Sequence, residues 1–81
     1  MISDLPNLGP KSAQLLRHAG IESVEQLRLM GPVASFLAVR RTGARPSLNL
    51  LWALAGALSD RHWQDISAAE KTTLLAELES E

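Results

Sequence analysis

The residues most capable of chemistry lie in the sequence LPNLGPKS, residues 5–12. Asn7 and Gly9 readily adopt positive φ angles, so the chain can turn sharply there. Pro10 suits the first position of a helix, because that position needs no N–H. Such a turn points several backbone N–H groups at one place, beside the positive end of the helix dipole. Residues 5–12 are therefore a candidate phosphate-binding loop, and the alternative is a loop that only begins the helix.

A second group of candidate binding residues is the short basic stretch RRTGARP, residues 40–46. Arg40 and Arg41 lie at the C-terminal end of a predicted helix, and Arg45 lies in the loop that follows it. The three arginines have two interpretations. In the first, they stabilise the negative end of the helix dipole and solubilise the surface. In the second, they contact a phosphate or an acidic protein surface. The sequence leaves both open.

The charges are divided unevenly along the chain, whose net charge is −1. Residues 1–45 hold six basic and three acidic residues, a net charge of +3. Residues 46–81 hold two basic and six acidic residues, a net charge of −4. A basic half of this kind can meet phosphates or an acidic partner while the acidic half faces away. The pI near 6.1 nevertheless argues against strong non-specific DNA binding.

The remaining polar residues match no catalytic or metal-binding pattern. The chain has no cysteine, and its two histidines, His18 and His62, lie too far apart for a local zinc motif. Asp60, His62 and Asp65 form the nearest catalytic-looking set, but their spacing matches no known mechanism. We therefore predict a protein that is not an enzyme and that holds neither a metal ion nor a cofactor.

Size and composition indicate a single domain over residues 1–81. Apolar residues make up 46% of the chain, and there is no internal repeat, low-complexity tract or linker. The N-terminal residues lack the features of a signal peptide, and the longest apolar run, residues 48–58, is too short to span a bilayer. We expect a soluble, cytoplasmic protein.

Helical signals divide the chain into about five short helices, and no strand is predicted. The expected helices run over residues 10–18, from Ser23 to Gly31, from Pro32 to Gly43, over residues 48–58 and from Ser67 onward. Ser23 with Gln26, and Ser67 with Glu70, have the spacing of capping boxes, in which each side chain bonds the other residue's backbone N–H.

The segment over residues 48–58 is the most apolar part of the chain and is predicted to be the central helix of the core. Ser47 is its expected N-cap. Trp52 and Trp63 are expected to be buried packing residues. Asn49 is expected to be a buried polar residue that binds a loop carbonyl.

The sequence also resembles known families. Residues 5–21, LPNLGPKSAQLLRHAGI, resemble the second half of a helix-hairpin-helix DNA-binding motif. They also resemble the NLGxKS segment in the C-terminal domain of the α chain of RNA polymerase. The segments NLGPKS, AGIxSVEQLR, SLNLLWALxGAL and HWxD together resemble the C-terminal domain of the TfoX/Sxy family, over residues 5–78. This resemblance implies an all-α bundle with a partial helix-hairpin-helix motif at its N-terminus, here without the family's N-terminal α/β domain.

The TfoX/Sxy family includes competence regulators thought to be transcriptional co-activators, so the resemblance implies a regulatory binding module. Two modes of action remain open. In the first, the domain contacts a regulatory protein partner or a second copy of itself. In the second, it binds DNA phosphates without reading the base sequence. The candidate DNA contacts are the loop residues Asn7, Leu8 and Gly9, then Lys11 and Ser12, with Arg40, Arg41 and Arg45 as auxiliaries.

Overall fold

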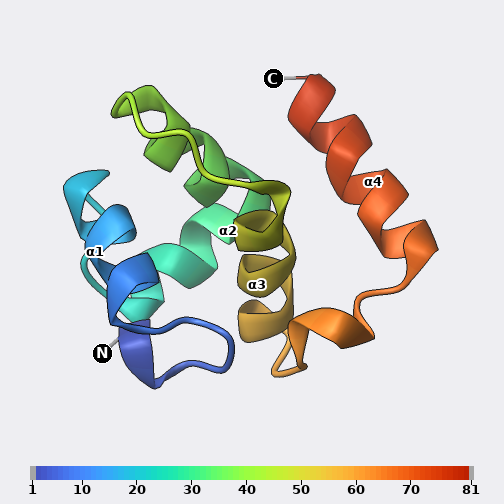
Figure 1. Cartoon of the computed structure of the whole chain (residues 1–81), viewed down its shortest axis with the longest axis horizontal. Coiled ribbons are helices and arrows are strands. Elements are labelled where there is room, and N and C mark those ends of the chain that lie inside the picture. The colour runs from blue at the N-terminus through green and yellow to red at the C-terminus, as the bar shows by residue number, and fades with distance from the viewer. Residues whose placement is uncertain (1, 81) are drawn as a thin grey trace.

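The computed structural model describes residues 2–80, whose helices pack around a central helix pair (Figure 1). Within this range there are four α-helices, two single turns of 3-10 helix and no strand, so the all-α prediction is confirmed. Met1 and Glu81, the ends of the predicted domain, lie outside the described residues. In chain order the elements are η1 (Ile2–Asp4), α1 (Pro10–His18), α2 (Val24–Arg41), α3 (Leu48–Leu58), η2 (Trp63–Asp65) and α4 (Ala68–Glu79).

The second and third predicted helices are joined in α2, which contains a sharp kink. Gly31, at φ 80° and ψ 173°, is not helical and separates two helical stretches. Glycine adopts this conformation at little steric cost, and Pro32 begins the second stretch because it has no N–H to leave unpaired. The hydroxyl of Ser35 donates to the carbonyl oxygen of Gly31 at 2.6 Å. Within residues 2–80, the expected count of about five helices therefore becomes four, one of them kinked.

Both predicted capping boxes are present. At the start of α2, Ser23 Oγ accepts from the N–H of Gln26 at 3.1 Å, and Gln26 Oε1 accepts from the N–H of Ser23 at 3.2 Å. At the start of α4, Ser67 Oγ accepts from the N–H of Glu70 at 3.1 Å, and Glu70 Oε1 accepts from the N–H of Ser67 at 3.4 Å. The two helices therefore begin at the residues that the sequence predicts.

Helix α3 is the centre of the core, as predicted. Seven of its 11 residues are buried, Trp52 among them, and the helix packs most extensively against α2. Asn49, by contrast, is exposed, so the expectation of a buried amide there is wrong. Among the described residues, no helix combines the length and hydropathy that crossing a membrane requires.

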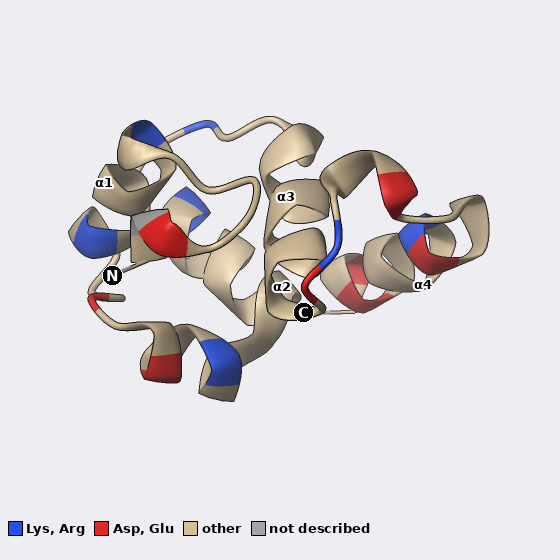
Figure 2. Cartoon of the chain, turned by 90° about the horizontal axis from the view of Figure 1, so that it is seen from below, with Lys and Arg blue, Asp and Glu red and all other residues tan. Residues whose placement is uncertain are grey.

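Helices α1 and α4 lie on opposite sides of α2 and α3 (Figure 1). Every described residue of α4 keeps part of its surface exposed, and its leucines are half-buried against the core. Two charged contacts hold this helix. Arg61 forms a two-pronged ion pair with Glu70, and Lys71 Nζ lies 5.3 Å from the ring centroid of Trp52. The acidic residues of α4 thus lie on the far side of α3 from α1 (Figure 2).

Candidate functional site

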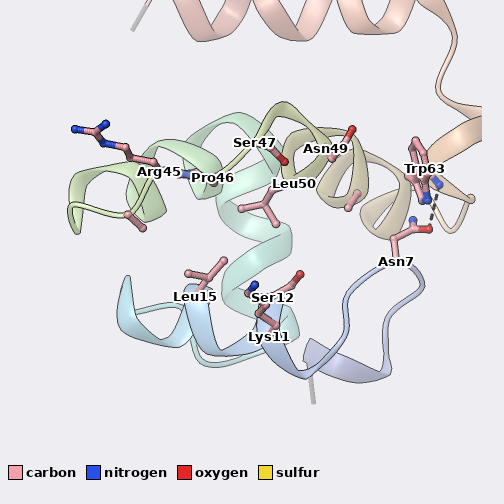
Figure 3. A pocket seen from close by; sticks show the side chains of 12 residues that line it. Asn7, Lys11, Ser12, Leu15, Arg45, Pro46, Ser47, Asn49, Leu50 and Trp63 are labelled. Carbon is pink, nitrogen blue, oxygen red and sulfur yellow. Dashed lines mark hydrogen bonds between the residues drawn. The ribbon is translucent and has the colours of Figure 1, made fainter.

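A groove lies between α1 and the segment that leads into α3 (Figure 3). Its main part is a pocket of about 600 Å³, and a second pocket of about 530 Å³ shares Lys11, Leu15 and Ala44 with it. We call the two pockets together the α1–α3 groove. The main pocket is lined by Asn7, Lys11, Ser12, Leu15, Ala44, Arg45, Pro46, Ser47, Asn49, Leu50, Ala53 and Trp63. The second pocket adds Gln14, His18 and Thr42.

One wall of the groove is a single face of α1. Lys11, Gln14, Leu15 and His18 are spaced by three or four residues, so they form one stripe along the helix. The facing wall runs from Thr42, in the connection between α2 and α3, to Leu50, in the first turn of α3. The groove therefore exists because the α2–α3 connection returns alongside α1.

The floor of the groove is apolar. Leu15, from α1, and Leu50, from α3, point into the space from opposite sides (Figure 3). Leu50 is buried and Leu15 is half-buried, and Ala53 and Trp63 continue this apolar surface. Apolar atoms in a concave site favour a ligand that brings apolar atoms of its own.

The charges along the groove are all basic. Lys11 and Arg45 are exposed and His18 lines the second pocket, whereas none of the lining residues found within the described chain is an aspartate or glutamate. Neither Lys11 nor Arg45 forms a salt bridge with another described residue. In a chain with more acidic than basic residues, this makes the groove a local region of positive potential.

Two helices begin at this groove, and within the described residues neither start has a side-chain cap. Gly9 is the N-cap of α1 and has no side chain to offer, and Pro10 follows it. Ser47 occupies the N-cap position of α3, as predicted, but in residues 2–80 its hydroxyl makes no capping hydrogen bond. The positive ends of both helix dipoles therefore add to the potential from Lys11 and Arg45.

Asn7 closes one end of the groove. Its Nδ2 donates to the carbonyl oxygen of Arg61 at 2.8 Å, and its Oδ1 accepts from the N–H of Trp63 at 3.0 Å. Its φ of 70° is the positive angle that the sequence predicts. Gly56 of α3 lies against this junction, since a Cβ there would stand 2.7 Å from both Arg61 O and Asn7 Nδ2. Asn7 is therefore a tertiary clamp that joins the first loop to the chain before η2.

The helix-hairpin-helix motif predicted at the N-terminus is not confirmed. Within residues 2–80, the element before the loop is η1, a three-residue turn of 3-10 helix instead of an α-helix. Gly9 has φ −91° and ψ −173°, an extended conformation, so the expected turn from positive φ at this glycine is wrong. In this loop, the described residue with a positive φ is Asn7, and its side chain is held by the clamp.

The predicted binding residues fall into two groups. Lys11, Ser12 and Arg45 all line the main pocket, with the Arg45 side chain extending outward from its edge (Figure 3), and Asn7 lines its end. The other four residues do not line it. Leu8 is a core residue that is 2% exposed, Gly9 is the N-cap of α1, Arg40 lies 5.1 Å from the ring centroid of Phe36, and Arg41 is exposed in the last turn of α2.

Sequence reasoning missed the apolar part of the site. Leu15 and Leu50 have helical spacing within their own segments, which marks them as core residues and gives no sign that they face each other across a groove. Trp63, expected to be buried, is half-buried and lines the pocket. Ser47 and Asn49 gave a weak sequence signal for an open site, because they are polar residues at the start of the most apolar helix.

Asp60, His62 and Asp65, the catalytic-looking set, lie in the turn after α3, at the N-cap of η2 and at the last residue of η2. His62 Nδ1 accepts from the N–H of Gln64 at 3.1 Å, so its side chain caps η2. Asp60 has φ 58° in the turn after α3. Among the residues that the structure describes, no cluster of three or more His, Cys, Asp or Glu could hold a metal ion.

The chain is similar to two curated proteins. It is 35% identical over 77 residues to the DNA transformation protein TfoX of Haemophilus influenzae, covering 95% of this chain and 36% of that protein. It is 32% identical over 78 residues to the DNA transformation protein TfoX1 of Aliivibrio fischeri, covering 95% of this chain and 37% of that protein. The chain thus spans little more than a third of the relatives' length and matches their C-terminal part.

Two solved structures from Listeria monocytogenes have the same fold. One, described as an uncharacterized protein, has a TM-score of 0.87 and 30% identity, covering 98% of this chain and 90% of its own. The other, described as a protein of unknown function, has a TM-score of 0.86 and 31% identity, covering 96% of each chain. The model of the TfoX C-terminal domain family matches residues 1–78. The chain therefore belongs to the TfoX C-terminal domain family.

Proposed function

We propose that this domain is a non-enzymatic regulatory binding module of the TfoX type that acts through protein–protein contacts. The observation that supports a protein partner best is the apolar floor of the α1–α3 groove, where Leu15 and Leu50 face each other. An apolar floor contributes binding free energy when a ligand removes it from water. Protein side chains do this, whereas a DNA backbone presents mainly charged phosphates. The curated relatives are named for DNA transformation, so the regulated process is natural competence.

Sequence-independent DNA binding is the second candidate, and one observation favours it. Lys11, Ser12 and Arg45 all line the groove, although Arg45 is 34 positions after Lys11 in the sequence. A phosphate could accept hydrogen bonds there, with an affinity that falls steeply with salt. Two observations weigh against it: Asn7 uses both amide atoms within the protein, and the net charge of the chain is −1.

A chimaera tests the proposed function. In Haemophilus influenzae, this chain replaces the matching segment of TfoX, and the frequency of natural transformation is measured. Ser12→Trp then fills the groove, because Ser12 is half-buried and points into it (Figure 3). The matched control is Arg17→Trp, on the exposed outer face of α1.

We expect the chimaera to restore transformation, Ser12→Trp to abolish it, and Arg17→Trp to retain it. A folded and expressed chimaera that fails to support transformation would contradict the proposal, as would a fully active Ser12→Trp chimaera. A titration of labelled duplex DNA at low and moderate salt decides the second candidate. Saturable binding by the isolated domain at moderate salt, lost in Lys11→Glu/Arg45→Glu, would establish DNA as the ligand of this groove.

A further inference from the structure

The two walls of the α1–α3 groove carry the same combination of chemistry. Each has a basic residue at its rim, Lys11 on α1 and Arg45 on the α2–α3 connection, and each has a leucine on the floor. Both basic side chains are exposed, and neither is in a salt bridge within the described residues. A ligand that matches this surface has apolar groups along its centre and negative charge at its edges.

The length of the groove indicates how much of a ligand it holds. The lining residues of α1 run from Lys11, in its first turn, to His18, in its last. This helix has nine residues and a length of about 13 Å at ~1.5 Å per residue. A segment of about two to three helical turns spans that distance.

Resting on the protein-binding function proposed above, we infer that the partner of the α1–α3 groove is an acidic amphipathic segment of another protein. Its apolar side chains cover Leu15 and Leu50, and its carboxylates lie beside Lys11 and Arg45. The uncapped starts of α1 and α3 strengthen the positive potential at the same place. The acidic helix α4 lies on the other side of α3, so it does not repel such a ligand at short range (Figure 1).

Three synthetic peptides of 15 residues test this inference, each labelled with fluorescein and titrated by fluorescence anisotropy. The first has leucines at helical spacing on one face and glutamates on the other. The second keeps the leucines and replaces each glutamate with lysine. The third has the composition of the first, reordered so that the leucines no longer share a face. We expect the first peptide to bind, and the second and third to bind at least about tenfold more weakly.

Charge-reversed variants locate the site. Lys11→Glu/Arg45→Glu is expected to lower the affinity for the first peptide at least about fivefold, since two attractive contacts become repulsive. The matched control is Arg17→Glu/Arg41→Glu, which changes the net charge equally at two exposed residues that do not line the groove. It should alter the affinity by less than about twofold. Glutamate at residue 11 suits the first turn of α1, so loss of binding there does not reflect loss of the helix.

Each contrary result has a definite meaning. Equal weakening by the two double variants would show that only net charge matters, and equal binding of the reordered peptide would show that the apolar floor has no role. Either result would overturn the inference. Displacement of the peptide by a lower concentration of duplex DNA would overturn it in favour of DNA. If no peptide binds while the Ser12→Trp chimaera still fails to transform, the inference fails and the protein-binding function stands.

Discussion

The four α-helices begin in two different ways. Helices α2 and α4 begin in capping boxes, where Ser23 and Ser67 bond the third residue of each helix and are bonded in return. Helices α1 and α3 begin at Gly9 and Ser47, and within the described part of the chain neither start has a side-chain cap. Each capping box pairs two backbone N–H groups with side chains of the start itself. At the start of α3, by contrast, the N–H of Leu50 donates to the carbonyl oxygen of Ser47 at 3.0 Å.

The uncapped starts are the ones that face the α1–α3 groove. Lys11 and Ser12 come from the first turn of α1, and Ser47 and Asn49 come from the start of α3. A capping box fixes a helix start through neighbouring residues. Because the described residues give α1 no such cap, contacts from elsewhere in the chain must position its start. The clamp of Asn7 between Arg61 and Trp63 supplies such contacts. Local capping boxes therefore fix the starts of α2 and α4, and a long-range clamp fixes the loop that leads into α1.

Removal of the clamp should have the largest effect on stability. Asn7→Ala leaves the carbonyl of Arg61 and the N–H of Trp63 unpaired, at a cost of about 1–3 kcal/mol. It also places alanine at φ 70°, which adds about 1–2 kcal/mol. We expect the free energy of unfolding, measured by urea denaturation, to fall by about 2–5 kcal/mol.

Asn7→Gly separates the two contributions, because glycine tolerates the positive φ and lacks the amide. It should lose about 1–3 kcal/mol, less than Asn7→Ala. If the glycine variant were as stable as the wild type, the amide would have no clamping role and the contrast between the two kinds of helix start would disappear.

Gly56→Ala should have the next largest effect. It should lower the free energy of unfolding, whereas a glycine-to-alanine change inside a helix usually raises it. In an ordinary helix interior, alanine is more stable than glycine by about 1 kcal/mol. Here the new Cβ would stand 2.7 Å from the carbonyl oxygen of Arg61, a backbone atom, so the clamp must shift. We expect a loss of about 1–3 kcal/mol by urea denaturation. A gain in stability would mean that the junction gives way easily and that α1 is positioned by other contacts.

Local parts of the fold are predictable from the sequence because their signals are local. The bounds of α1 and α3, the two capping boxes and the break at Gly31 are all confirmed. Each depends on residues within a few positions of one another, such as a serine and the residue three places after it. The same reasoning identifies the helix that becomes the core, because α3 is apolar on more than one face.

The groove could not be predicted in this way, since its parts are distant in the sequence. Lys11 and Arg45 come together only because the α2–α3 connection returns alongside α1. The clamp joins Asn7 to residues 54 and 56 positions away. An amide that binds a loop carbonyl was expected at Asn49, and the structure has that interaction at Asn7 instead. An asparagine near a loop predicts that an amide binds a loop carbonyl, but tertiary packing decides which asparagine makes that bond.

Three serine substitutions compare the helix starts directly. Ser23→Ala and Ser67→Ala each remove a capping bond, and each should cost about 1 kcal/mol. Ser47→Ala removes an exposed hydroxyl that caps nothing in the described range, so its cost should stay within about 0.5 kcal/mol. Urea denaturation of the three variants under one condition checks the order. A cost at Ser47 equal to the other two would show that α3 is capped in solution, and the distinction between the starts would not hold.

The smallest expected effect lies within one capping box and depends on pH. The hydrogen bond from Arg61, followed by that from the N–H of Ser67, lowers the pKa of Glu70 to about 2 from its ordinary value of 4.5. Because the folded state favours the charged form, this stabilisation is complete above pH 4.5 and is lost as the pH falls through about 2. Glu70→Gln keeps a side chain that can complete the box, as Gln26 does in α2, and removes only the ion pair.

We therefore expect Glu70→Gln to lower Tm slightly at neutral pH, and the difference from the wild type to vanish as the pH approaches 2. Thermal denaturation followed by circular dichroism at several pH values measures it. The control is Glu77→Gln, which removes the same charge near the end of α4, where a carboxylate opposes the helix dipole. Its Tm should be equal to or above that of the wild type at neutral pH. If both variants shifted Tm equally, the effect would come from net charge, and the start of α4 would be held by its capping box alone, as the start of α2 is.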